Sequence, residues 1–279
     1  MTAPLDTALP LLRCPVCSDD LVRDAGVLQC GSGHAFDIAR QGFVTLLAGA
    51  RPHAGDTSAM IAARDRFLAT GHYATIAAAV TGAVGDHAPA GPLLDLAAGT
   101  GWYAARVLDT TPDRFGLAVD VSTPGLKRAA RAHPRLAAVG ADAWGTLPLR
   151  DASVAAVLSV FGPRTADELR RVLQPDGVVV TVTPTPRHLA EIVGPLGMLD
   201  VGGDKSIRLR SAFAAFDPVA TESVEYVVTL DHPALTDLAG MGPTGHHQDA
   251  AALAAKVTAL PDTVEVTVSV DVTTFRTTT

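Results

Sequence analysis

Three cysteines and one histidine near the N-terminus form the pattern in this chain that most directly indicates chemistry. They follow the spacing C-x2-C, twelve residues, C-x3-H, and they include every cysteine among the 279 residues. Thiolate sulfur and imidazole nitrogen suit tetrahedral Zn²⁺, and four protein ligands leave no open position for a reacting molecule. The spacing therefore predicts a closed, structural zinc site. Its ligands are Cys14, Cys17, Cys30 and His34.

Other uses of these cysteines fit the sequence less well. A disulfide would leave one thiol over, and the rest of the chain is typical of an intracellular protein. Three unrelated free thiols would not need to gather beside a histidine. Gly31 and Gly33 lie within the second half of the pattern, where they permit the backbone angles of a tight metal turn.

A second pattern is an apolar run that leads into a glycine turn and then a helix. Gly99 and Gly101, with Thr100 between them, allow the backbone to approach a ligand closely. Asp95 stands just before this turn. A second apolar run, about 20 residues later, ends in Asp120, which is placed to accept hydrogen bonds from ribose hydroxyls.

Two nucleotide cofactors fit the glycine turn. The letters GTGWYA match the dinucleotide fingerprint G-x-G-x-x-A, which alone is a weak signal for NAD. S-adenosylmethionine fits better, because the Asp95 carboxylate would repel a pyrophosphate but can lie beside a sulfonium or an amino group. Asp142 follows the next strand, where methyltransferases present an acid to adenine; a helix cap is the alternative role for it. The letters LQPDG at 173–177 are similar to the turn before the fifth methyltransferase strand.

The elements that must position these residues alternate along the chain. Such alternation predicts an α/β fold, in which a mostly parallel sheet has helices on both faces. Near the C-terminus, two period-two strands rich in Val and Thr flank a helix. The expected strands are 93–97, 115–121, 136–139, 154–160, 177–183, 223–230 and 264–275, and expected helices include 101–109, 124–133 and 165–173.

Composition limits the function classes. The net charge of −7 argues against a protein that coats nucleic acid, although it allows a local basic surface. No stretch approaches the roughly 18 apolar residues of a membrane span. The first ten residues carry an acid and no basic cluster, unlike a signal peptide. We therefore expect a cytoplasmic enzyme without a membrane segment.

Several longer motifs are distributed over the whole chain: CPxC at 14–17, GHxFDIARQGFV at 33–44, ATGHY at 69–73, RAARAHP at 128–134, TLPLRD at 146–151 and MGP at 241–243. In these motifs the sequence resembles the 23S ribosomal RNA guanine-N1 methyltransferases of the RlmA type. The resemblance is greatest to the class II branch, which includes the tylosin- and mycinamicin-resistance enzymes. A match of this extent is far more specific than either core motif alone.

The resemblance implies a Rossmann-like class I methyltransferase domain, whose mostly parallel sheet carries an antiparallel C-terminal strand, preceded by a zinc ribbon that helps bind RNA. It also implies a homodimer and a substrate guanine in a 23S rRNA hairpin loop. Macrolide resistance and housekeeping modification both remain open as roles. The cofactor contacts that it implies are Tyr73, Gly99, Thr100 and His188. The expected parts are a ribbon over 1–50, a helical linker over 51–84 that contributes to the cofactor site, and the methyltransferase domain over 85–279.

The chain departs from the family pattern at two places. Ala97 and Ala98 stand where members usually have a glycine and a small residue, so each adds a Cβ near the cofactor turn. The aromatic residue that is common after Met-x-Pro is also missing, which puts the contacts to the target base in doubt. In its place are Thr244, Gly245, His246 and His247.

The sequence does not assign a general base. Guanine N1 carries a proton that must be lost before methylation at neutral pH. Asp56, His246 and His247 are candidates for the base, yet each is equally typical of a surface or capping residue. Phe161, after the fourth strand, is placed either to stack on an unstacked base or to pack the strand end.

Basic residues provide the candidate RNA contacts. They gather near the ribbon and the linker, and two more share a helix face at i, i+4 spacing. A solvated surface explains such groups about as well when they are considered alone. The residues are Arg40, Arg51, Arg64, Arg66, Lys127 and Arg131.

Two rival functions remain. A methyltransferase for a small molecule would use the same cofactor, but it would not need a separate metal-held module. An RNA- or protein-binding protein with a vestigial cofactor fold would explain Ala97 and Ala98, whereas the intact acids and glycines of the turn argue for catalysis. Methyl transfer to a 23S rRNA hairpin separates the three functions.

Overall fold

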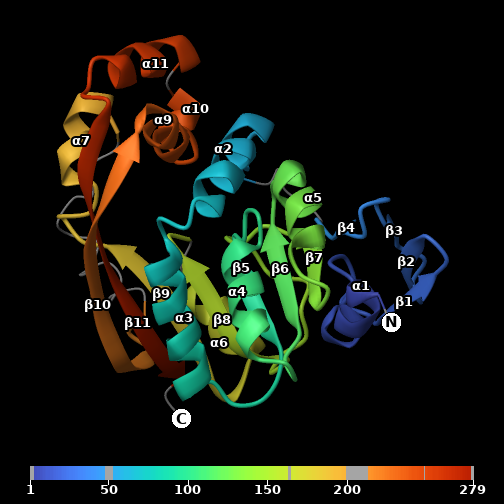
Figure 1. Ribbon diagram of the computed structural model, residues 1–279. Helices are drawn as coiled ribbons and strands as arrows, with labels where there is room; N and C mark the ends of the chain where they lie inside the picture. The colour runs from blue at the N-terminus through green and yellow to red at the C-terminus, as the bar shows by residue number, and fades with distance from the viewer. Residues whose placement is uncertain (1–2, 48–52, 163–164, 199–212, 248, 278–279) are drawn as a thin grey trace.

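The computed structural model describes residues 3–47, 53–162, 165–198, 213–247 and 249–277. It contains a small three-stranded sheet near the N-terminus and a large mixed sheet with helices on both faces (Figure 1). The strands are β1 Leu21–Asp24, β2 Val27–Cys30, β3 Ala35–Asp37, β4 Val44–Thr45, β5 Leu93–Leu96, β6 Gly116–Asp120, β7 Leu136–Gly140, β8 Val154–Val160, β9 Leu173–Pro184, β10 Phe216–Asp231 and β11 Thr263–Thr277.

The large sheet has the strand order β10-β11-β9-β8-β5-β6-β7-β4. Strands β4 to β9 in this sheet run parallel, while β11 pairs antiparallel with β9 and β10 pairs antiparallel with β11. The chain order therefore reverses direction between β5 and β8, which is where ligands bind in open α/β sheets. The expected α/β fold, with a mostly parallel sheet and antiparallel C-terminal strands, is confirmed.

The helices divide into a layer on each face of the sheet. They are α1 Pro4–Ala8, α2 Ser58–Ala69, α3 Ala74–His87, α4 Trp102–Thr110, α5 Thr123–Ala132, α6 Ala166–Val172, α7 Ala190–Leu196, α9 His232–Gly240, α10 Thr244–His247 and α11 Ala250–Thr258, with a short 3-10 turn at Leu9–Leu11. Helices α2 to α5 share one core with α7, α9 and α11, and α1 and α6 share the other with the ribbon.

Burial on both faces explains the composition of the central strands. Leu93 of β5 packs into the core with α3 and α4, whereas its neighbour Leu94 packs into the opposite core. Every residue of β5, β6 and β7 is buried, so these strands are continuous apolar runs rather than alternating ones. That pattern made the parallel strands recognisable in the sequence.

Helices α2 and α3 lie largely within the segment expected to be a helical linker. Thr57 caps α2, because its hydroxyl oxygen accepts a hydrogen bond from the Met60 amide at 3.3 Å. Gly71, with a φ of 82°, ends this helix, and Tyr73 begins the next one. Within the described residues no single helix is long and apolar enough to cross a membrane. Helices α2 and α3 reach that length only as a pair, which bends by 85°.

The ribbon is attached both to the large sheet and to the segment between β7 and β8. Strand β4 pairs in parallel with β7, and the Leu46 amide donates to the Gly140 carbonyl at 2.7 Å. Leu12 forms an antiparallel bridge with Leu149. Helix α1 packs beside β7, in the core shared by ribbon and sheet (Figure 1). The ribbon sequence thus supplies the outermost strand of the large sheet.

Candidate zinc and cofactor sites

The four predicted zinc ligands lie together. Their ligand atoms are all within 4.8 Å of one another. The Cys30 sulfur is 3.3 Å from the His34 Nδ1 atom, and the Cys17 and Cys30 sulfurs are 3.6 Å apart. Three thiolates and one imidazole nitrogen in this arrangement fit a tetrahedral Zn²⁺ site with no remaining position. The structure confirms that the pattern at 14–34 forms a single site.

Two tight turns bring the ligands together. In the first, the Ser18 amide donates to the Cys14 carbonyl at 2.9 Å, and Ser18 has a left-handed φ of 65°. In the second, the Gly33 amide donates to the Cys30 carbonyl at 3.0 Å, with a φ of 88° at Gly33. The expectation that a glycine permits the second turn is confirmed at Gly33, whereas a serine takes this conformation in the first turn.

The glycine turn after β5 is built from left-handed residues. Gly99 and Gly101 have φ values of 55° and 73°, and Gly101 precedes the first residue of α4. Thr100, between them, is buried. Ala97 also adopts a left-handed φ, of 56°, which explains why glycine is usual at this family position. Ala97 therefore costs backbone strain of about 1–2 kcal/mol and does not block the turn.

Asp120, at the end of β6, fastens the glycine turn. Its Oδ2 atom accepts a hydrogen bond from the Gly99 amide at 2.7 Å, and Oδ1 accepts one from the Ser122 amide at 2.7 Å. Burial raises the pKa of Asp120 despite these two bonds. The carboxylate thus has a structural role that the sequence did not predict, in addition to its expected ribose contact. Each oxygen keeps a second lone pair for a ligand.

Asp95 differs from Asp120 because one of its oxygens has no partner. Its side chain is only 3% exposed, and among the described residues Oδ2 accepts no hydrogen bond. Burial, followed by repulsion from Asp120, raises the pKa of Asp95 to about 7, although a backbone hydrogen bond involving Ala104 opposes this. A buried acceptor without a partner is costly, so it indicates a site for a cationic or hydrogen-donating ligand.

Asp142, after β7, contacts the linker. Its Oδ2 atom lies 2.8 Å from the His53 Nδ1 atom, and its Oδ1 accepts from the Trp144 amide at 2.9 Å. Burial alone would raise the pKa of Asp142, but these contacts hold it below the usual value. Instead of capping a long helix, Asp142 closes a short turn and holds the linker.

The linker continues from His53 along the ends of β6 and β7. The Ser122 hydroxyl donates to the Asp56 carbonyl at 2.7 Å. A Cβ on Gly55 would lie 2.9 Å from the Ser122 amide nitrogen, so the close contact requires glycine there. Residues 53–56 therefore lie beside the edge at which the predicted cofactor residues gather.

Aromatic residues form the other side of this edge. Tyr73 is buried at the start of α3, and its hydroxyl lies 3.4 Å from the His188 Nε2 atom. The Ser269 amide donates to the His188 Nδ1 atom at 3.2 Å, which places the proton of a neutral ring on Nε2. Burial raises the pKa of Tyr73, so its phenol stays protonated.

Phe161 completes the aromatic group. Its ring stacks against His188, with centroids 5.8 Å apart and planes inclined by 25°. The side chain is 42% exposed, so Phe161 does not merely pack the strand end. Its φ is 53°, and a Cβ on the following Gly162 would lie 3.3 Å from the Leu96 carbonyl oxygen at the end of β5. A strained backbone beside an exposed ring is typical of a functional site.

Sequence reasoning placed most of these residues but missed their partners. His53 and Ser269 enter the site only through pairings distant in the chain, and no local pattern marks them. Met241 belongs to the MGP motif, and its carbonyl accepts a hydrogen bond from Arg64. Arg64 was expected on an RNA-binding surface; instead it forms an ion pair of 2.7 Å with Asp56 and lies against the Gly99 turn. The candidate base Asp56 is held by that pair.

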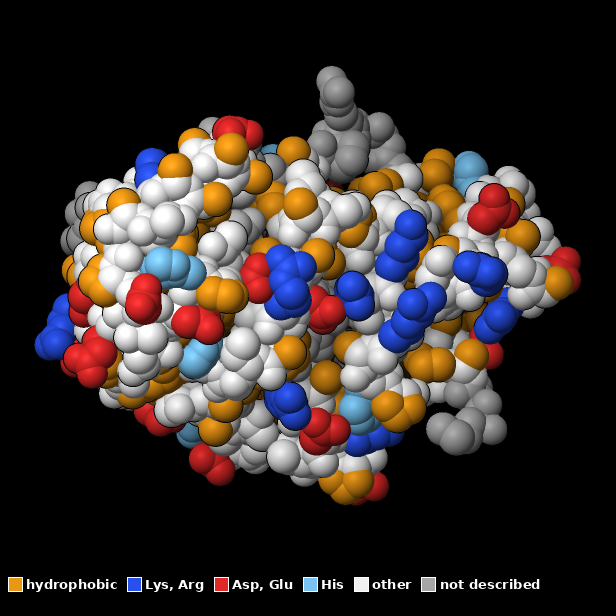
Figure 2. Space-filling view, turned by 45° about the horizontal axis from the view of Figure 1, so that its top comes forward, with side chains coloured by type: hydrophobic (Ala, Val, Ile, Leu, Met, Phe, Trp, Pro, Cys, Tyr) orange, Lys and Arg blue, Asp and Glu red, His pale blue; other side chains and the backbone are white. Residues whose placement is uncertain are grey.

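Some expected residues lie outside the described parts. Arg51 is among them, and so are the side chains of His246 and His247 at the end of α10. Of the expected RNA contacts, Arg40, Lys127 and Arg131 are exposed, and none forms an ion pair within the described parts. Figure 2 shows one face of the molecule, on which Lys and Arg side chains gather from the middle toward the right. The ribbon lies on the right in Figure 1.

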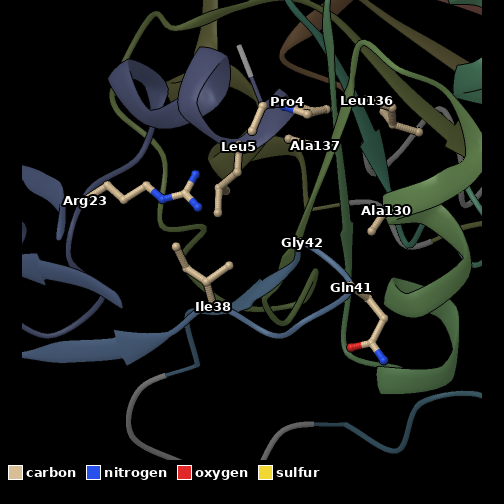
Figure 3. Close-up of a pocket in the computed structure, with 10 residues that line it drawn as sticks. Pro4, Leu5, Arg23, Ile38, Gln41, Gly42, Ala130, Leu136 and Ala137 are labelled. Carbon is tan, nitrogen blue, oxygen red and sulfur yellow. The ribbon is translucent and has the colours of Figure 1, made fainter. Parts of the chain in front are cut away.

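A separate cavity lies between the ribbon and the large sheet. Leu5 and Ile38 point toward one another across it, and Gln41 lies on the side of α5 (Figure 3). Its volume is about 130 Å³, whereas ligand pockets measure roughly 300–1,000 Å³. None of the predicted cofactor residues lines it, so it is not the cofactor site.

The residues at the carboxyl edge of the sheet fit S-adenosylmethionine. The unpartnered Asp95 oxygen offers a counter-charge for an ammonium or sulfonium group, and Asp120 offers lone pairs for ribose hydroxyls. A Cβ on Gly99 would lie 2.5 Å from an Arg64 nitrogen and would displace that side chain, and the left-handed φ of 55° also favours glycine there. These features match the donors and acceptors of the cofactor.

Comparisons with known proteins agree with both sites. Residues 12–50 match the zinc-ribbon family model described as "RlmA, N-terminal", and residues 93–177 match a methyltransferase domain model. A Micromonospora griseorubida protein named as a 23S rRNA (guanine-N(1)-)-methyltransferase is 46% identical over 96% of this chain and 98% of its own. The Streptomyces fradiae 23S rRNA (guanine(748)-N(1))-methyltransferase is 44% identical over 95% of this chain and 96% of its own.

Proposed function

Because this chain belongs to the RlmA-type 23S rRNA (guanine-N1)-methyltransferases, we propose that it methylates N1 of a guanine in a 23S rRNA hairpin loop. The observation that carries the proposal is a sequence identity of 44–46% over nearly the whole chain, which includes both the ribbon and the cofactor turn. A small-molecule methyltransferase would share only the second of these parts.

The proposed cofactor residues divide by chemistry. S-adenosylmethionine, when bound, supplies an electrophilic methyl group on a sulfonium sulfur. Asp95 compensates positive charge, Asp120 orients the ribose, and Asp142 accepts from the adenine amino group once His53 gives way. The backbone of Gly99, Thr100 and Gly101 packs against the cofactor, as proposed from the family motif. Tyr73 and His188 bound the methyl-transfer side with neutral hydrogen-bonding groups.

We propose Phe161 as the platform for the target base. Its exposed face permits stacking of a guanine that has left its own stack, which contributes about 1–3 kcal/mol per base. The stack with His188 and the left-handed backbone hold the ring in one orientation. A guanine held on this ring would be positioned for transfer to N1, and such positioning would supply much of the rate acceleration.

We propose that the chain has three parts. Residues 1–50 form the RNA-gripping ribbon, 51–84 the linker that closes one side of the cofactor site, and 85–279 the methyltransferase domain. Exposed Arg40 on the ribbon and Lys127 and Arg131 on α5 contact phosphates of the hairpin. The gathering of basic side chains between these parts supports this arrangement (Figure 2).

We also propose a cytoplasmic homodimer that confers resistance to tylosin- or mycinamicin-type macrolides. The location follows from the ribosomal RNA substrate, and the dimer follows from the family resemblance. Sedimentation velocity checks the dimer, because a single species of monomer mass contradicts it.

Drug susceptibility of a host that expresses the protein checks the resistance role, and unchanged inhibitory concentrations would favour housekeeping modification.

Transfer of labelled methyl groups to a 23S rRNA hairpin tests the main proposal. Nucleoside mass spectrometry should then detect 1-methylguanosine. Binding of cofactor and RNA without transfer would identify a non-catalytic protein, and binding of cofactor without RNA binding would favour a small-molecule acceptor. Either result overturns the proposal.

Charge reversal tests the RNA surface separately. Changing Lys127 and Arg131 to Glu should weaken hairpin binding at low salt and reduce the slope of log affinity against log salt by about 2. Arg106→Glu is a matched control, because Arg106 is exposed on α4, where it stacks over Trp102. If the α5 change and the Arg106 change weakened binding equally, the proposal that α5 contacts RNA would be wrong.

A further inference from the structure

Arg64 lies beside the proposed cofactor site, although the sequence motifs and the family resemblance do not assign it a cofactor contact. It belongs to α2, and its side chain is 26% exposed. The Nη1 atom is 2.5 Å from the position that a Cβ on Gly99 would occupy. Among the described residues, this guanidinium is therefore a cation in direct proximity to the glycine turn.

The remaining contacts hold the guanidinium in place from one side. The Nη2 atom donates to the Met241 carbonyl at 2.8 Å and lies 2.7 Å from the Asp56 carboxylate. Within the described parts of the chain, the hydrogen bond and the ion pair of Arg64 both use Nη2. Nη1 is thus held beside the turn and keeps its hydrogen-bond donors for a ligand.

The charges around the turn explain what such a donor would bind. Asp95 and Asp120 supply negative charge, and the positive charge of Arg64 opposes the rise in the pKa of Asp120. The methionine end of S-adenosylmethionine carries an ammonium group and a carboxylate. Two acids alone would attract the first and repel the second, whereas a guanidinium provides the complementary partner.

We infer that Arg64 binds the α-carboxylate of the methionine moiety through Nη1 and so fixes the cofactor's amino-acid end against the Gly99 turn. The inference rests on the use of S-adenosylmethionine by this site. Its alternative is a purely structural role, in which Arg64 only ties α2 to Met241 and Asp56. Only in the first role does the affinity that Arg64 provides depend on the carboxylate of the cofactor.

Calorimetric binding of two ligands to the whole protein separates these roles. S-adenosylmethionine and decarboxylated S-adenosylmethionine differ at the carboxylate that Arg64 should recognise. Wild-type protein should bind the intact cofactor at least tenfold more tightly. Arg64→Gln should weaken intact-cofactor binding by about 10–100-fold and analogue binding by less than about threefold, which removes the preference. Arg64→Lys, which keeps the charge but not the fork, should restore part of the preference.

Arg66→Gln is the matched control. Arg66 lies two positions along the same helix but forms a bidentate ion pair with Asp237 instead. This variant should keep the wild-type preference between the two ligands. Equal weakening of both ligands by Arg64→Gln, or an unchanged preference in Arg64→Lys and Arg64→Gln, would overturn the inference. Failure of wild-type protein to bind either ligand would instead overturn the proposed cofactor.

Discussion

The zinc site and the cofactor site hold their functional groups in opposite ways. The four zinc ligands come from 21 consecutive positions, 14 to 34, and their donor atoms face one another at distances as short as 3.3 Å. The proposed cofactor residues come from positions 73 to 188, and hydrogen bonds to other protein groups hold several of them. We therefore expect the ribbon to depend on its metal for order, and protein hydrogen bonds to hold much of the proposed cofactor site.

The two sites also differ in what a lost residue would disturb. Removal of one thiolate leaves a metal site incomplete and affects the whole ribbon. In the proposed cofactor site, Asp120 has a structural function, while one oxygen of Asp95 has no hydrogen-bond partner among the described residues. The unpartnered oxygen favours the proposal that Asp95 contacts a ligand, because leaving it without a partner costs stability.

The largest expected effect is on the ribbon. Cys30→Ser should abolish stoichiometric zinc binding and reduce methylation of the rRNA hairpin by at least about 100-fold, because small metal-held modules lose their fold without the ion. The affinity for S-adenosylmethionine should change by less than threefold. Zinc content, hairpin methylation and calorimetric cofactor binding measure the three quantities.

Gln29→Ser is the control for that change, since Gln29 is exposed beside Cys30 on β2 and is not a ligand. It should retain zinc and activity. If Cys30→Ser weakened cofactor binding as strongly as methylation, the two sites would not be independent.

Asp95→Asn should have opposite effects on the empty protein and on the complex. A pKa of about 7 means that the folded protein keeps a proton that the unfolded chain loses near pH 4. Stability therefore falls between about pH 4 and pH 7, by roughly 4 kcal/mol from this group. Asparagine removes that loss, so chemical denaturation at pH 8 should show a variant more stable than wild type.

Cofactor binding should show the reverse dependence. A positively charged ligand favours ionised Asp95, so wild-type affinity should rise about tenfold from pH 6 to pH 8. Asp95→Asn should bind more weakly at pH 8 and lack this rise. Calorimetry across the pH range measures it, and a pH-dependent rise that persists in the variant would have to come from another group, such as neighbouring Asp120.

Phe161→Ala should affect the acceptor rather than the cofactor. Loss of a stacking surface should lower kcat/KM for the hairpin by about 10–100-fold, while cofactor affinity changes by less than twofold. Phe161→Tyr keeps the ring and should retain most activity. A fall in cofactor affinity equal to the fall in kcat/KM would place the ring beside the cofactor instead.

The smallest expected effect concerns the backbone of the glycine turn. Ala97→Gly should raise the free energy of unfolding by about 0.5–1 kcal/mol, because glycine adopts the left-handed φ of 56° without strain. Ala98 lacks such a conformation, so Ala98→Gly should lower stability. Urea denaturation of both variants checks the difference, and stabilisation by both would refute this explanation of Ala97.

The same contrast explains what could be predicted from the sequence. The zinc ligands and the glycine turn are local patterns, and the buried parallel strands are apolar runs, so their positions were predictable. The contact of His188 with Ser269 joins residues 81 positions apart, and that of Asp142 with His53 joins residues 89 apart. Such pairings follow from the packing of distant elements and leave no periodic signal.

Strand β4 has a consequence for how genes of this type can recombine. Val44 and Thr45 complete the edge of the large sheet at β7. A genetic exchange near codon 50 would therefore replace a strand of this sheet together with the ribbon. An incoming segment that did not pair with β7 would leave the backbone donors and acceptors of β7, and the apolar surface beneath α1, exposed. Recombination can therefore replace the loops that carry the metal ligands. Exchange of the whole ribbon requires an incoming β4 strand that fits the existing edge at β7.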